Sequence, residues 1–104
     1  MNHRTHQIIN ELKSNISKKY TIQEMRLFGS LARGDANKNS DIDVFLCISE
    51  LNHDIEVELF DYAYDIELKY DCLIDLIVFD QNSLARKYYI TPIYQNILKE
   101  GIII

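Results

Sequence analysis

The chain has 104 residues, a length that supports a single compact domain over residues 1–104, and a hydrophobic content of 47% that can supply one core. Its formal net charge of −5 disfavours a direct nucleic-acid interface, which normally needs a basic face. No apolar stretch reaches the ~20 residues that cross a bilayer, and residues 1–6 are too polar for a secretory leader, so we expect a cytoplasmic protein without membrane contact. Cys47 and Cys72 are interpreted as core thiols in buried strands.

The first predicted elements are a helix over residues 4–19 and a strand over residues 22–28. The strand runs into Gly29-Ser30-Leu31-Ala32-Arg33-Gly34, where glycine allows the main chain to approach a ligand closely. If a helical turn follows, its free backbone N–H groups would point toward a bound anion. The Ser30 hydroxyl and the positive charge of Arg33 suit a phosphate. Taken alone, Gly29-Ser30 is also compatible with an ordinary turn at the end of a strand.

The second predicted strand covers residues 42–48 and begins at a pair of acidic residues. Asp41 and Asp43 are two positions apart, so their side chains share one face of the strand. Two carboxylates this close repel each other unless a positive charge lies between them. Magnesium favours oxygen ligands and is often held by one or two carboxylates together with substrate phosphates. The pair alone could simply cap the strand, but its spacing from Gly29-Ser30 favours a nucleotide and metal site.

A second helix is predicted over residues 53–70, with one face turned toward the core. On another face an acidic stripe follows helical spacing, at Asp54, Glu58, Asp61 and Asp65. Such a run is usually a solvated face, and the alternative is a docking surface for a basic partner. The helix makes the connection from the second strand to a third long enough for a right-handed crossover, which predicts that these two strands are parallel.

The third predicted strand, residues 74–79, carries Asp75 as the one charge in an apolar run. Burying this carboxylate without a partner would be costly, which favours a metal or a hydrogen-bond donor beside it. The alternative is an edge strand with Asp75 facing water. Beyond it we expect a short helix from residue 82 or 83 to residue 89, and a second from Thr91-Pro92 to Gly101. The tail of residues 102–104 is expected to pair with the sheet edge or to contact another protein.

Two segments together resemble a known signature. Gly29-Ser30-Leu31-Ala32-Arg33-Gly34-Asp35 followed by Ser40-Asp41-Ile42-Asp43-Val44 is similar to the motif of the polymerase-beta-like nucleotidyltransferase superfamily, in particular its minimal nucleotidyltransferases. The family has a third aspartate on a later strand, which corresponds to Asp75. With the predicted elements, this resemblance implies an α/β (α+β) fold: a small mixed sheet of about three or four strands with helices packed mainly on one face.

The resemblance also implies an activity, the magnesium-dependent transfer of AMP from ATP to an acceptor hydroxyl. Asp41 and Asp43 would hold two magnesium ions, and Asp75 would complete the second metal site and act as the base. Gly29 and Ser30 would bind the β- and γ-phosphates. Members of this size commonly act as the antitoxin of a HEPN-type helical toxin and can attach AMP to a toxin tyrosine, which implies a HEPN partner and an assembly with it.

Two other functions stay open from the sequence. One is a binding module that keeps the fold and inhibits its partner by contact, although Asp41, Asp43, Asp75, Gly29 and Ser30 are all present. The other is an enzyme that modifies small molecules such as antibiotics, for which we would expect an additional acceptor-binding domain.

Overall fold

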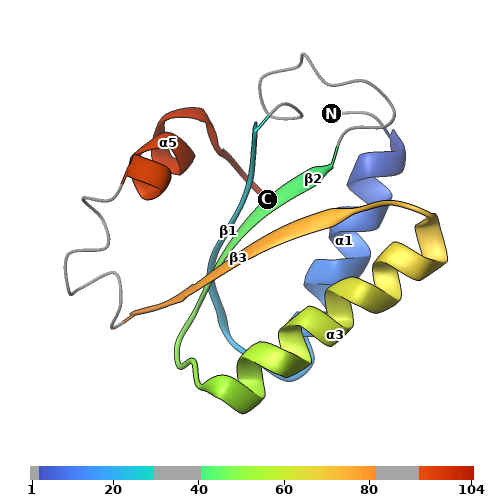
Figure 1. Cartoon of the computed structure of the whole chain (residues 1–104), viewed down its shortest axis with the longest axis horizontal. Helices are drawn as coiled ribbons and strands as arrows, with labels where there is room; N and C mark the ends of the chain where they lie inside the picture. Colours follow the sequence, from blue (N-terminus) through green and yellow to red (C-terminus); the bar gives the residue numbers. More distant parts are fainter. Residues whose placement is uncertain (1–2, 30–40, 82–91) are drawn as a thin grey trace.

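The computed structural model describes residues 3–29, 41–81 and 92–104. In chain order its elements are α1 (His3–Ser17), β1 (Ile22–Phe28), β2 (Ile42–Ile48), α3 (His53–Tyr70), β3 (Ile74–Asp80), α5 (Pro92–Glu100) and β4 (Ile102–Ile103). The described strands form one four-stranded sheet in the order β3-β2-β1-β4. β2 and β3 are parallel, whereas β1 is antiparallel to both β2 and β4. The predicted mixed sheet and the parallel second and third strands are therefore confirmed (Figure 1).

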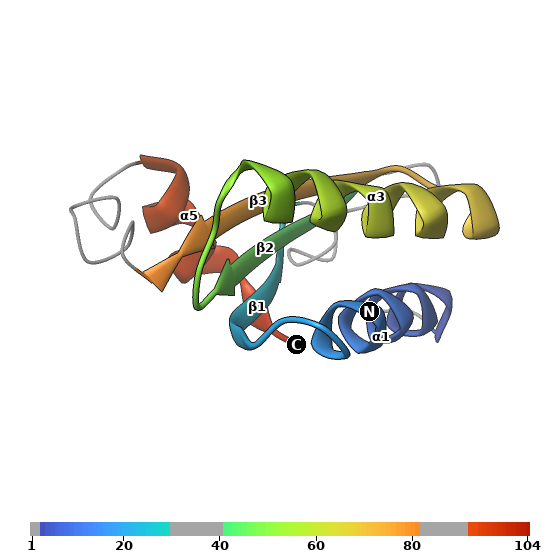
Figure 2. The same cartoon turned by 90° about the horizontal axis from the view of Figure 1, so that it is seen from below.

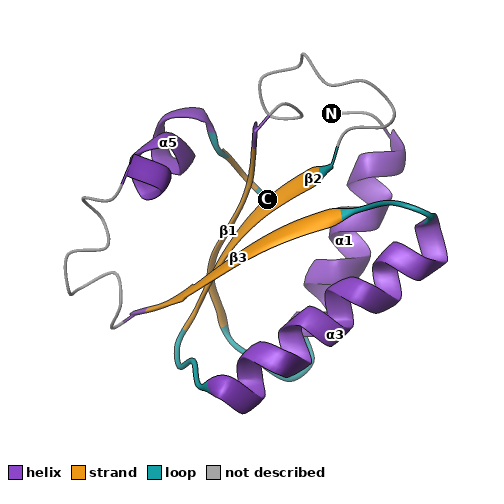
Figure 3. Cartoon of the chain, in the orientation of Figure 1, coloured by secondary structure: helices purple, strands orange, loops and turns teal. Residues whose placement is uncertain are grey.

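The two faces of the sheet are covered unequally (Figures 2 and 3). α1 and α3 pack together over one face, where alternate β2 residues such as Val44 and Leu46 join the main core. On the other face, Phe45 and Cys47 form a smaller cluster with Ile97 of α5. This alternation follows from the pleat of a strand, which turns successive side chains to opposite faces. The two larger helices, α1 and α3, thus do not cover the second face of the sheet.

The described helices begin and end near the predicted positions. α1 buries the predicted stripe of Ile8, Ile9, Leu12 and Ile16. α3 starts after Asn52, whose Oδ1 accepts a hydrogen bond of 2.9 Å from the backbone N–H of Ile55, as an N-cap residue does. The left-handed Asp71, with φ of 51°, ends α3. Gly101 follows α5 as predicted, and its N–H donates to the carbonyl of Ile97 at 2.7 Å.

The isoleucine tail adds a strand to the sheet. Ile102 and Ile103 form β4, which pairs with Leu27 and Arg26 of β1, so the first of the two predicted outcomes for the tail is confirmed. The helix expected between residues 82 and 89 lies outside the described residues. Cys72 lies in the turn between α3 and β3 and is only partly buried, so its prediction as a buried strand residue was wrong. No helix in the described ranges is long and apolar enough to cross a membrane.

Candidate nucleotide and metal site

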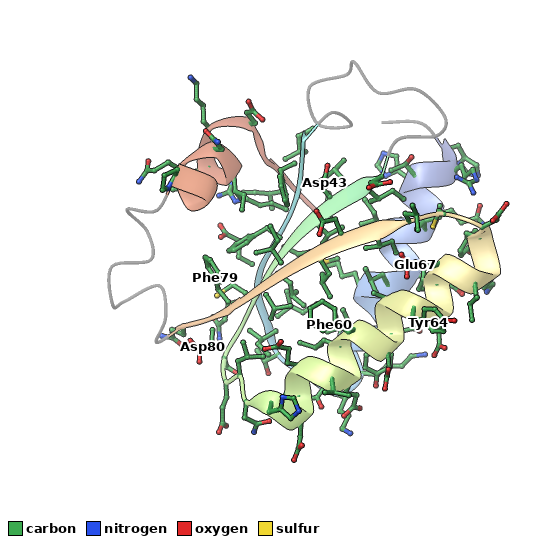
Figure 4. The ribbon with its side chains drawn as sticks, in the orientation of Figure 1. Asp43, Phe60, Tyr64, Glu67, Phe79 and Asp80 are labelled. Carbon is green, nitrogen blue, oxygen red and sulfur yellow. The ribbon has the colours of Figure 1, made fainter. Side chains whose placement is uncertain are left out.

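A row of three residues crosses the sheet at the beginning of β2 and β3. Phe28 at the end of β1 is paired with Asp43 of β2, and Asp43 is paired with Asp75 of β3. Neighbouring strands lie about 4.8 Å apart, so two residues in register start their side chains side by side on the same face. Figure 4 shows Asp43 at the opposite end of the strands from Phe79 and Asp80. The fold therefore brings together two carboxylates that are 32 positions apart in sequence.

Gly29 presses the backbone against Asp43. Its φ is +71°, a left-handed conformation that side chains other than glycine rarely adopt. A Cβ atom built at this position would lie 2.1 Å from Oδ2 of Asp43, far inside van der Waals contact. Only glycine leaves this space free beside the carboxylate. The conformation and the contact give two separate physical reasons for glycine directly after β1.

The other two predicted aspartates are solvent-accessible. Asp41 is exposed and lies directly before β2, two positions from Asp43. Asp75 is also exposed, on β3 at the edge of the sheet. The cost of burying Asp75, which favoured a metal beside it, therefore does not apply, because the main helices cover the opposite face. Its pairing with Asp43 is instead the structural reason to include Asp75 in the candidate site.

The donor atoms match a hard divalent cation in kind, since Mg²⁺ prefers carboxylate oxygens. Within residues 3–29, 41–81 and 92–104, no three His, Cys, Asp or Glu side chains are gathered closely enough to hold a metal ion. The close approach of Gly29 restricts the position of the Asp43 carboxylate. Ser30 and Arg33, the predicted phosphate contacts, lie outside the described residues. The metal and phosphate assignments therefore remain predictions.

Two further features of this face were not predicted. Arg26 of β1 is paired with Phe45, one row from Asp43 on the same face, and its Nη2 lies 2.8 Å from Oε1 of Glu24. The alternation of charged and apolar residues along β1 was the sequence signal that could have placed Arg26 on this face. Burial, with the nearby carboxylates of Glu24 and Asp80, raises the pKa of Cys47 to about 11. This thiol stays protonated at neutral pH and is a poor nucleophile.

The comparison with known families agrees with this arrangement of strands and aspartates. The model of the nucleotidyltransferase domain matches residues 7–104. The chain belongs to this family. It is therefore an enzyme of the nucleotidyltransferase type, and the resemblance seen in the motifs is confirmed.

Individual relatives agree with the family assignment. A protein of Methanocaldococcus jannaschii provisionally named a protein adenylyltransferase is 34% identical over 91% of this chain and 88% of its own length. A crystal structure described as a toxin-antitoxin with AMP-PNP has a TM-score of 0.63 at 26% identity, over 98% of this chain and 72% of that chain. A further structure, of a tri-AMPylated Shewanella oneidensis HEPN toxin with its MNT antitoxin, has a TM-score of 0.56 at 24% identity, over 96% and 67%, and shows the common fold.

Proposed function

We propose that this nucleotidyltransferase, as a single domain over residues 1–104, transfers AMP from ATP to a tyrosine hydroxyl of a HEPN-type helical toxin and thereby acts as its antitoxin. The observation that carries the proposal is the pairing of Asp43 with Asp75 across β2 and β3, with Gly29 pressed against Asp43. The relative named as a protein adenylyltransferase supports a protein acceptor. The similar structures described as toxin-antitoxin complexes, one with AMP-PNP and one with an AMPylated HEPN toxin, support the nucleotide and the partner.

In this proposal Asp41 and Asp43 would hold two magnesium ions, and Asp75 would complete the second site. When bound, such ions neutralise phosphate charge and stabilise the attacking and leaving oxygens. The backbone N–H of Gly29 and the hydroxyl of Ser30 bind the β- and γ-phosphates, and the guanidinium of Arg33 adds a positive charge.

The transfer itself is an in-line displacement at the α-phosphorus. The acceptor oxygen forms the new P–O bond while the bond to the pyrophosphate group breaks, and pyrophosphate leaves. Asp75 accepts the proton of the acceptor hydroxyl. The exposure of Asp75 at the edge of the sheet leaves this carboxylate accessible to a residue presented by another protein. AMP becomes attached to the partner, and the tyrosine loses its free hydroxyl.

The decisive experiment is co-expression of the chain with a HEPN-type toxin, followed by intact mass spectrometry of that toxin. Wild type should add AMP to it, whereas Asp75→Asn should bind the partner but leave it unmodified and toxic. Asp80→Asn, at the far end of the same strand, serves as the matched control and should transfer AMP as wild type does.

A second candidate function is inhibition by contact alone. It is favoured by the apolar side chains that α3 exposes, which offer a binding surface independent of the aspartates. Unmodified toxin that is nevertheless fully inhibited, or full protection by Asp75→Asn, would establish inhibition by contact and refute the catalytic proposal.

A further inference from the structure

α3 carries a row of apolar side chains that does not face the core. Val57, Phe60, Tyr64 and Leu68 are 46%, 43%, 57% and 65% exposed. Their spacing of three, four and four residues places them along one face of the helix. We call this row the apolar ridge. An exposed apolar row of this length is typical of surfaces that bind another molecule.

Contacts on either side show where the apolar ridge points. On one side, Oε2 of Glu67 accepts a hydrogen bond of 2.8 Å from the backbone N–H of Ile74 in β3. On the other side, Oε1 of Glu58 lies 2.7 Å from Nζ of Lys19, which is two residues beyond the end of α1. Figure 4 shows Glu67 between α3 and β3, with Phe60 and Tyr64 along the helix. The apolar ridge therefore runs along the outer surface of α3, between the β3 side and the α1 side.

Carboxylates border the apolar ridge on both sides. Asp54, Asp61 and Asp65 are exposed on the side of Glu58, three of the four residues of the predicted acidic stripe. Glu56 is exposed on the side of Glu67. No lysine or arginine occurs between residues 53 and 68. The charged residues that α3 itself contributes along the ridge are therefore all acidic, while Lys19 pairs with Glu58 at the α1 margin.

We propose that the apolar ridge is the docking surface for the protein partner, and that the partner contacts it with an apolar face bordered by lysine or arginine. The inference rests on the proposed function only for the identity of this partner. Complementary charges around an apolar centre favour encounter and fix the orientation of a complex. A second copy of this chain fits poorly, because a symmetric pair of ridges would bring carboxylates against carboxylates.

The position of the apolar ridge also suits delivery of an acceptor. The Glu67 side of α3 adjoins β3, which forms one edge of the sheet. Asp75 lies exposed on that same strand, directly after Ile74. A partner that binds the ridge and extends across this edge reaches the face that carries Asp75. One bound protein can therefore occupy the ridge and present a hydroxyl to the site.

The test measures binding of the purified HEPN-type partner by isothermal titration calorimetry. Tyr64→Glu and Leu68→Glu should each weaken binding at least tenfold, because each places a charge in the apolar centre. Both positions are more than half exposed, so both variants should melt at the wild-type temperature. Leu98→Glu is the matched control, since Leu98 is an exposed leucine on α5, and it should bind within twofold of wild type.

A charge test uses Asp61→Lys with Asp65→Lys, which should weaken binding and reduce its dependence on salt concentration. Wild-type binding by Tyr64→Glu and Leu68→Glu would refute the docking surface. Light scattering that shows a dimer of the chain alone, dissociated by Leu68→Glu, would instead assign the ridge to a second copy. Loss of binding in these variants, with no AMP transfer by wild type, would uphold the docking surface and refute the proposed activity.

Discussion

The contact between Gly29 and Asp43 links backbone conformation to chemistry at the scale of single residues. The left-handed φ of Gly29 and the 2.1 Å that would separate a Cβ from Asp43 Oδ2 both exclude larger residues. The nearby Asp75 needs no comparable constraint, because it is exposed on an edge strand. Asp43 is thus the more tightly positioned of the two carboxylates, and its placement depends on its neighbour as much as on its own strand.

We predict that Gly29→Ala lowers the free energy of unfolding by about 1–3 kcal/mol, because it combines a strained backbone with a displaced carboxylate. AMP transfer should fall at least tenfold. Urea denaturation and a transfer assay measure the two effects. The control is the same substitution in an Asp43→Ala background, where removal of Oδ2 should leave only the smaller backbone cost. An equal loss of stability in both backgrounds would show that the contact with Asp43 is unimportant.

At the scale of elements, polar contacts join α3 to α1 and to the turn that follows α1. Glu58 of α3 lies 2.7 Å from Lys19 and accepts a hydrogen bond of 2.6 Å from the hydroxyl of Tyr20. Near the other end of the helix, Lys69 lies 2.5 Å from Glu11 of α1. The sequence predicted Glu58 as part of a solvated acidic stripe, whereas in the structure its carboxylate pairs with Lys19 and Tyr20. α3 presents one face to the core, one margin to α1 and the apolar ridge to the outside.

We predict that Glu58→Gln lowers the melting temperature by a few degrees at neutral pH, since exposed ion pairs contribute little. The hydrogen bonds from Lys19 and Tyr20 lower the pKa of Glu58 below its ordinary 4.5. Its stabilising effect is therefore complete above about pH 4.5 and is lost as the pH falls through the lowered pKa. Melting curves of wild type and variant should converge in acid. Glu56→Gln removes an exposed carboxylate of the same helix that makes no contact with Lys19 or Tyr20, and it is the control at neutral pH, where it should lower the melting temperature less than Glu58→Gln does. A difference between wild type and Glu58→Gln that persists in strong acid would contradict the assignment.

At the scale of the whole molecule, the two faces of the sheet carry different groups of residues. The main core lies between the sheet and α1 with α3, whereas Asp43 faces the other side with the smaller Phe45 cluster. The proposed site and the main core therefore use different faces of the same strands. Substitutions in the aspartates should change ligand binding without removing the apolar contacts that hold the fold.

We predict that Mg²⁺ or Mn²⁺ raises the melting temperature and that ATP adds to the shift, because ligands that bind only the folded state stabilise it. Asp43→Asn should fold but lose most of the shift produced by metal alone. Asp54→Asn, which removes a carboxylate on α3 instead, should retain it. Differential scanning calorimetry makes the comparison. If saturating metal and ATP leave the wild-type melting temperature unchanged, the proposed metal and nucleotide site is wrong.

The sequence by itself determined the family and the elements that the structure describes. Strands rich in β-branched residues, helical apolar spacing and the joint motif around Gly29 and Asp43 are local signals, and local signals can be read along the chain. The parallel β2 and β3 also followed, because the connecting helix leaves room for a crossover. The main core residues of α1 were predicted for the same reason.

Only the tertiary structure decided which residues become neighbours and which remain exposed. Spacing along the chain does not specify register, and it was the pairing of β2 with β3 that placed Asp75 beside Asp43. Asp75 faces solvent because the strand order places β3 at the edge of the sheet. The apolar ridge could not be predicted from the sequence either, since helical spacing shows that side chains share a face but not whether another element covers that face.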